Sequence, residues 1–248
     1  MLDRKPIRLV MLTALICATG CSSHTPTATV SAHNQAAIGA PDTRNKAARP
    51  YPFNPDNPIR FVGKPNDMGY GGVKRLTQDA EIPAGLSESD LKRVLRNAAL
   101  SLYNKEFPDA LAINARIWSP RGDVDQDGLA VATVEYAPNG RWADAHKSDP
   151  KKLVYRIGKA YSRAGEELTR DAYGASVVLQ SKIQNKIELS KRMDDWSASM
   201  ITARIRNGSQ AVILDRRILI MSLDHVMVRY RVRAGSREGW IHGSAIKW

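Results

Sequence analysis

Three aspartates at alternate positions are the clearest candidate for a metal site. Asp123, Asp125 and Asp127 precede Gly128, which matches the first half of a calcium-binding loop, D-x-D-x-D-G. Alternate carboxylates converge on one hard cation, and the glycine permits the bend. The closing glutamate of such a loop belongs where this chain has Val134. Two interpretations follow: a Ca²⁺ ion held by the three aspartates, or an acidic loop between two strands.

Three arginines near the C-terminus form a candidate ligand-binding group. Arg229, Arg231 and Arg233 alternate with apolar residues, so a strand here would present the guanidinium groups on one face. Like charges in a row repel each other, and each therefore needs an acceptor. We expect these arginines and Trp240 to contact a ligand. The acceptor would be an external anion or one of three acidic residues of the chain: Asp215, Asp224 and Glu238.

The other reactive residue types show no catalytic signature. His146, His225 and His242 lie in no metal-ligand spacing, and the chain has neither a G-x-S-x-G nor a P-loop motif. His242 and Ser244 are two residues apart, a spacing that does not require their side chains to touch in a strand. We therefore expect a protein that is not an enzyme and that uses no cofactor apart from the Ca²⁺ ion considered above.

The elements that would position these residues begin with a helix after the Ser87 cap, where apolar residues recur at helical spacing as far as Pro108. Alternating apolar residues predict strands over 111–117, 129–136 and 153–157. A long second helix is predicted over 164–193, despite Gly174, from apolar residues three and four apart: Leu168, Ala172, Ala175, Leu179, Ile183 and Ile187. This order predicts an α+β domain, with a small antiparallel sheet, over residues 73–198.

Residues 199–248 change in character to short β segments separated by turn residues. The predicted segments are 201–205, 210–214, 218–221, 226–232 and 239–241. The sequence Gly239-Trp240-Ile241, with Ser244-Ala245-Ile246 after it, resembles the end of bacterial SH3-like domains. The resemblance covers about fifty residues and implies a small all-β barrel that contacts protein or peptidoglycan. The stretch from Ser87 to Trp142 resembles a domain of unassigned function found in bacterial envelope lipoproteins.

The N-terminal residues are typical of an export signal. Arg4, Lys5 and Arg8 precede an apolar run over 9–18, which is far shorter than the ~20 residues of a membrane-spanning helix. Small residues then stand immediately before Cys21. This pattern resembles bacterial lipoprotein precursors and implies a signal peptide over 1–20, with Cys21 as the lipid-modified first residue of the mature chain.

The resemblance implies an outer-membrane lipoprotein that faces the periplasm, since Ser22 follows the cysteine. Ala18 stands where the lipobox usually has leucine, so residues 18–20 also fit an ordinary secretory cleavage site. Simple secretion, an uncleaved anchor and an inner-membrane location remain alternatives. If Cys17 leaves with the signal and Cys21 is lipidated, the mature chain has no free thiol.

Residues 21–72 are predicted to form a disordered tether. The segment holds seven prolines and sparse apolar residues, so it buries too little apolar surface to offset chain entropy. Tyr51 and Phe53 are among the exceptions. They dock either on a partner or on their own folded domain, and we favour their own domain.

The net charge of +12 favours anionic partners such as lipid headgroups, cell-wall polymer or nucleic acid, and the export signal favours the first two. We therefore predict a lipid-anchored periplasmic binding protein that contacts an envelope protein or peptidoglycan through its SH3-like module, with no nucleic-acid partner. Two alternatives stay open. One is a cell-wall hydrolase targeted by that module, and the other is an accessory lipoprotein of a secretion or conjugation machine.

Overall fold

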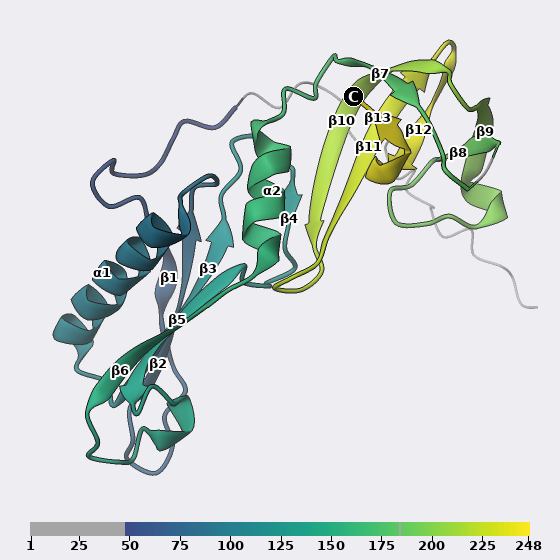
Figure 1. The fold of residues 1–248 in the computed structure, drawn as a ribbon. Helices are drawn as coiled ribbons and strands as arrows, with labels where there is room; N and C mark the ends of the chain where they lie inside the picture. The colour runs from purple at the N-terminus through teal and green to yellow at the C-terminus, as the bar shows by residue number, and fades with distance from the viewer. Residues whose placement is uncertain (1–47, 184) are drawn as a thin grey trace, which may run out of the picture. The chain divides into compact units, whose positions relative to one another are not determined.

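Strands dominate the computed structural model, which describes residues 48–183 and 185–248 (Figure 1). Two α-helices interrupt the strands in this part of the chain. The elements are β1 (Arg60–Asp67), β2 (Arg75–Ile82), α1 (Glu88–Glu106), β3 (Ala110–Ile117), β4 (Val124–Asp125), β5 (Ala132–Pro138), β6 (Lys151–Ile157), α2 (Lys159–Thr169), β7 (Ser176–Leu179), β8 (Lys186–Ser190), β9 (Ile201–Arg206), β10 (Gln210–Ile220), β11 (Val226–Ala234), β12 (Arg237–His242) and β13 (Ile246–Lys247).

The first sheet is built around one crossover connection. Its strand order is β1-β2-β3-β5-β6, in which β2 and β3 run parallel and the other neighbours are antiparallel. Parallel neighbours cannot be joined by a tight turn, and α1 supplies the crossover between them. Leu91 and Leu95 of α1 share a buried core with Ile113 of β3. The helix therefore covers the sheet whose strands it connects.

Ser87 caps α1, as the sequence predicts. Its side-chain oxygen accepts a hydrogen bond from the backbone N–H of Asp90 at 3.1 Å, and Phe107 ends the helix in the left-handed region, with φ 47°. The predicted apolar face is buried. The prediction for this helix is confirmed, and the three strands predicted after it are observed as β3, β5 and β6.

The predicted α+β class is wrong, because the long helix over 164–193 does not form. Helix α2 is short, and the apolar residues after it, including Leu179 and Ile187, lie in strands β7 and β8. Gly174 has a φ of +78°, in the left-handed region that a continuing α-helix does not use. Val177 and Leu179 are then buried two residues apart, which is the period of a strand.

The predicted SH3-like barrel is also wrong, because the C-terminal strands belong to a larger sheet that does not close. Its strand order is β13-β7-β10-β11-β12-β8-β9. Strand β4, which is not part of this order, also pairs with β10. The segments predicted at 210–214 and 218–221 form one long strand, β10, with a bulge between Ile213 and Asp215. Strands β7 and β8 come from the segment predicted as helix, so the two predicted domains share this sheet.

Part of the predicted disordered tether is folded. Strand β1 lies within it and pairs with β2. Phe53 is buried, and its ring makes an edge contact with Trp118 at a centroid distance of 5.6 Å. Tyr51 makes edge contacts with both rings. The prediction that the apolar residues of this segment pack on their own domain is confirmed for Tyr51, Phe53 and Ile59, whereas Phe61 is exposed. Residues 21–47 lie outside the described part of the chain.

The hairpin of β10 and β11 contributes to two hydrophobic cores. Ile218 is buried in the core of the first sheet, whereas Ile213 is buried in the core of the second. At the hairpin turn, the carbonyl of Leu223 lies so close to the start of α2 that a Cβ at Gly158 would be 1.7 Å from its oxygen. Both sheets accordingly belong to one compact unit.

Candidate functional site

Side chains suited to binding an anion gather on one face of β10, β11 and β12. Arg229 of β11 pairs in register with Arg217 of β10 and with His242 of β12, and directly paired residues lie on the same face of a sheet. Arg231 and Arg233 follow on this face, because the residues between them are buried on the other. We call it the arginine face, defined by Arg217, Arg229, Arg231, Arg233 and His242.

Two of these arginines are neutralised within the chain. Glu238 accepts from Nη2 of Arg231 at 3.2 Å and from Nε of Arg233 at 2.6 Å. Glu238 is one of the acceptors that the sequence proposed. One carboxylate therefore serves two guanidinium groups, which leaves them less able to attract an external anion.

Arg229 differs, because no acidic partner reaches it from the described residues. Its guanidinium carbon lies 5.1 Å from the ring centroid of Trp196, and its Nε is buried without a hydrogen-bond acceptor. Burial lowers the pKa of this guanidinium below its ordinary value, although an arginine stays charged at neutral pH. Arg217, the register neighbour of Arg229 on β10, adds a second positive charge. Arg229 is thus a partly buried cation that the fold does not neutralise.

Trp196 approaches Arg229 from the segment between β8 and β9. Its indole Nε1 is also buried, and no acceptor among the described residues reaches it. A buried donor without a partner costs about 1–3 kcal/mol. Because these two nitrogens are buried, an anion from outside the chain would have to contact the terminal guanidinium nitrogens of Arg229. Nothing in the sequence pattern singled out Trp196. Its only signal is an aromatic ring within a polar segment, far from Arg229 along the chain.

His242 and Ser244 touch, although their spacing did not require it. The Oγ of Ser244 is 2.8 Å from Nδ1 of His242, and the backbone N–H of Ser244 donates to the same nitrogen at 3.1 Å. The contact arises because β12 ends at His242, which caps the following 3-10 turn, Gly243–Ala245. Since Nδ1 accepts from an N–H, the neutral ring carries its proton on Nε2.

The electrostatics of His242 do not suit a general base. Burial, and then the positive charge of Arg229, lower the pKa of its imidazole. A catalytic histidine that activates serine needs its protonated form to be stabilised, usually by a carboxylate on the other ring nitrogen. Here a neighbouring cation does the opposite. The contact between His242 and Ser244 is therefore a turn cap rather than a nucleophile and its base.

Trp240, the fourth predicted ligand residue, is only 7% exposed. It pairs in register with Arg231 on one side and with Ser190 on the other. Because so little of its ring is accessible, Trp240 does not offer a platform to a ligand. Trp196 holds the aromatic position beside the unpaired arginine instead.

Asp123 is committed to a buried ion pair. Its Oδ2 accepts from Nε and Nη2 of Arg216, at 2.9 and 2.6 Å, and from the hydroxyl of Tyr173 at 3.3 Å. Both charged side chains are almost wholly buried. Across residues 48–183 and 185–248, no group of three or more His, Cys, Asp or Glu side chains is placed to hold a metal ion. The structure therefore does not bring Asp123, Asp125 and Asp127 together as a cation site.

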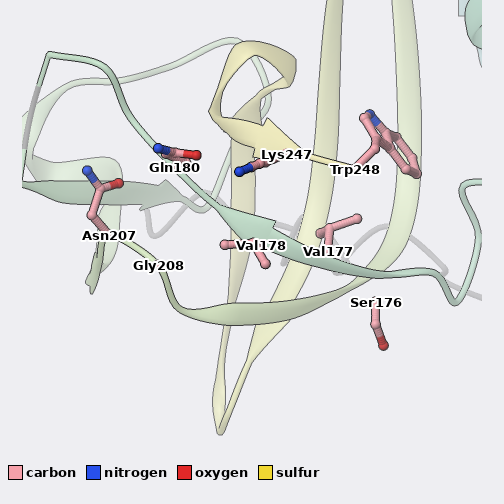
Figure 2. A pocket seen from close by; sticks show the side chains of 8 residues that line it. All are labelled: Ser176, Val177, Val178, Gln180, Asn207, Gly208, Lys247 and Trp248. Atoms are coloured by element: carbon pink, nitrogen blue, oxygen red, sulfur yellow. The ribbon is translucent and has the colours of Figure 1, made fainter.

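A separate cavity of about 470 Å³ lies on the second sheet. Figure 2 shows the side chains that line it. Val177 and Val178 of β7 line it, together with Gly208, Lys247 and Trp248. No residue of the arginine face lines this cavity. It is thus distinct from the site around Arg229.

Cys21, the predicted lipidation residue, lies outside the described part of the chain. Among the residues that the structure does describe, no helix is long and apolar enough to cross a membrane. Attachment through Cys21 stays a prediction.

Comparisons with known proteins do not explain this arrangement of side chains. The function of the chain must therefore be inferred from its own residues. No protein-family model, no curated protein and no solved structure matches the sequence or its fold.

Proposed function

We propose that this chain is a lipid-anchored binding protein of the bacterial envelope, and that its arginine face holds a carboxylate group of its partner. The observation that supports this proposal is the environment of Arg229. This guanidinium is partly buried and stacked on Trp196, and no acidic residue in the described chain pairs with it. Burying a charge without a partner costs free energy, and an external carboxylate would offset that cost.

A carboxylate suits this position because a guanidinium presents parallel N–H donors that match its two oxygens. Arg231 and Arg233 already share Glu238, so the face offers one strong position rather than a broad positive surface. The stem peptides of peptidoglycan carry carboxylates of this kind. We therefore name peptidoglycan as the partner, and an acidic envelope protein, including one of a secretion or conjugation machine, as the outcome to be distinguished from it.

Replacing Arg229 with Gln tests the site. We expect Arg229→Gln to weaken co-sedimentation with purified peptidoglycan about ten-fold, since losing a charge-assisted hydrogen bond costs roughly 1.5 kcal/mol. The matched control is Arg233→Gln, on the same strand and face, which should change binding less than about two-fold because Glu238 already neutralises that arginine.

Two outcomes would contradict this assignment. Equal losses in Arg229→Gln and Arg233→Gln would show that overall charge, and not the unpaired guanidinium, drives binding. No binding of the parent chain to peptidoglycan would exclude that partner. A protein retained from the envelope by the parent, and lost from Arg229→Gln, would then identify the alternative.

The anchor has its own test. Cys21→Ser removes the residue that would be lipidated, so we expect the protein to leave the membrane fraction and to lose incorporation of labelled fatty acid. Cys17→Ser is the matched control, because this residue would be discarded with the signal peptide. A Cys21→Ser chain that stays in the membrane fraction with unchanged mobility contradicts the anchor.

The hydrolase alternative gains one observation, the contact between His242 and Ser244, and that contact is poorly suited to catalysis. The imidazole of His242 has a lowered pKa, and its neighbour Arg229 is a cation. We therefore keep the proposal of a binding protein without enzymatic activity. A lytic band of the purified chain in a peptidoglycan zymogram, absent from Ser244→Ala, would overturn it.

A further inference from the structure

A second basic site lies at one end of the second sheet, between two turns. The cavity measures about 470 Å³ and is bounded by the turns that join β9 to β10 and β11 to β12. Arg204, Arg206 and Arg237 line it, together with the hydroxyl-bearing Ser209 and Ser236, and none of its lining residues is acidic. It shares no residue with the arginine face.

Only one of these arginines has an acidic partner in the described chain. Nε of Arg204 pairs with Oε1 of Glu188 at 3.0 Å. Arg237 donates from Nη1 to the backbone carbonyl of Arg204 at 3.2 Å, which orients its guanidinium without neutralising the charge. Arg206 makes no ion pair with the described residues, and its register neighbour on β8 is Lys186, another cation. The cavity therefore concentrates positive charge that the fold leaves uncompensated.

We propose that this cavity binds a phosphate group. A phosphate monoester carries up to two negative charges and three terminal oxygens, and the phosphodiester of a phospholipid headgroup carries one charge and two terminal oxygens. Either group can accept hydrogen bonds from more than one guanidinium group. The serine hydroxyls supply neutral donors beside the charges. The volume admits a phosphate together with part of the molecule that carries it. The phosphate belongs either to a soluble ester or to a phospholipid headgroup, and this inference does not depend on the site at Arg229.

Titration of the full-length chain with inorganic phosphate tests the chemistry. We expect phosphate to bind more tightly than chloride at equal ionic strength, as measured by calorimetry. The double variant Arg206→Gln/Arg237→Gln should bind phosphate roughly five-fold more weakly. The matched control, Lys92→Gln/Arg93→Gln, removes the same charge from the exposed face of α1 and should bind phosphate as the parent does.

Vesicles distinguish the two sources of phosphate. The chain carrying Cys21→Ser is added to vesicles of phosphatidylglycerol and, separately, of phosphatidylcholine, so that no lipid anchor contributes. If the double variant loses its preference for phosphatidylglycerol, the ligand is a headgroup. If that preference is unchanged while inorganic phosphate binds more weakly, the ligand is a soluble phosphate ester.

Two results would overturn the inference. One is equal phosphate affinity in the parent and the double variant, and the other is phosphate binding no tighter than that of chloride. Arg206→Gln alone serves as the test if the double variant does not fold, because this exposed side chain makes no ion pair in the described structure. Arg229→Gln should keep the phosphate affinity of the parent, so this site and the proposed carboxylate site succeed or fail separately.

Discussion

Arg216 and Arg229 lie on opposite faces of the same two strands, in contrasting environments. Arg216 is 3% exposed, and Asp123 accepts from its Nε and Nη2 while the carbonyl of Arg170 accepts from Nη1. Arg229 lies at the next register position on β11, where the ring of Trp196 contacts it and no acidic side chain of the described residues pairs with it. The fold thus satisfies the charge that it buries completely, and it leaves the half-buried charge to be satisfied from outside. The first arginine is structural, and the second is available to a ligand.

The largest expected effect comes from breaking the buried pair. Arg216→Leu leaves the Asp123 carboxylate buried without its partner, so we expect the free energy of unfolding to fall by about 3–5 kcal/mol in urea denaturation. The double variant Asp123→Leu/Arg216→Leu should lose less than this single variant, because no uncompensated charge remains. A loss below about 1 kcal/mol in Arg216→Leu would show that the pair is not structural.

A much smaller effect is expected on the opposite face. Arg229→Met removes a charge that has no acceptor among the described residues, and the side chain of the methionine can still cover Trp196. We expect the free energy of unfolding to stay unchanged or to rise by up to about 1 kcal/mol. The same urea denaturation measures it. A loss as large as that of Arg216→Leu would reveal an internal acceptor for Arg229 and remove the contrast between the two arginines.

The smallest expected effect is a change in the pKa of His242. The pKa of His242 lies below its ordinary value of 6.5, partly because of the charge on Arg229. Arg229→Gln should therefore raise the pKa of His242 toward 6.5 in an NMR titration, whereas Arg233→Gln should leave it where it is. An unchanged pKa in Arg229→Gln would mean that burial alone accounts for the shift.

The lowered pKa of His242 also predicts the direction in which stability changes with pH. Because the folded-state pKa is depressed, the folded protein binds fewer protons at His242 than the unfolded chain does. The contribution of His242 to stability is therefore intact above about pH 6.5 and is lost as the pH falls toward the folded-state pKa. Arg229→Gln should flatten this decline.

Local signals explain which elements were predictable. Helix α1 follows from a cap and an apolar spacing that lie within one stretch of chain. Strands β7 and β8 could not be predicted in this way, because the spacing of Leu179 and Ile187 fits a helix as well as it fits a strand. Their state is decided by pairing with β10, β12 and β9, which come later in the chain. The barrel was mispredicted for the same reason, since the missing strands of the sheet lay in the segment assigned to a helix.

The site shows a similar division. Alternation along β11 placed Arg229, Arg231 and Arg233 on one face, which needs only the period of a strand. Their different roles follow from Glu238 and Trp196, whose positions depend on the tertiary structure. The acidic loop was ambiguous in the same way, because the partner of Asp123 is Arg216, 93 residues later. Sequence spacing gives no information about such a pair.

The hairpin shared by the two cores has a consequence for the order of folding. A nascent chain that has emerged only as far as α2 lacks Ile218 and Ile220, which are buried among the side chains of the first sheet. Until those strands arrive, that apolar surface stays exposed to water and to chaperones. The strands of the first sheet all precede α2, but its hydrophobic core is complete only once β10 has been added.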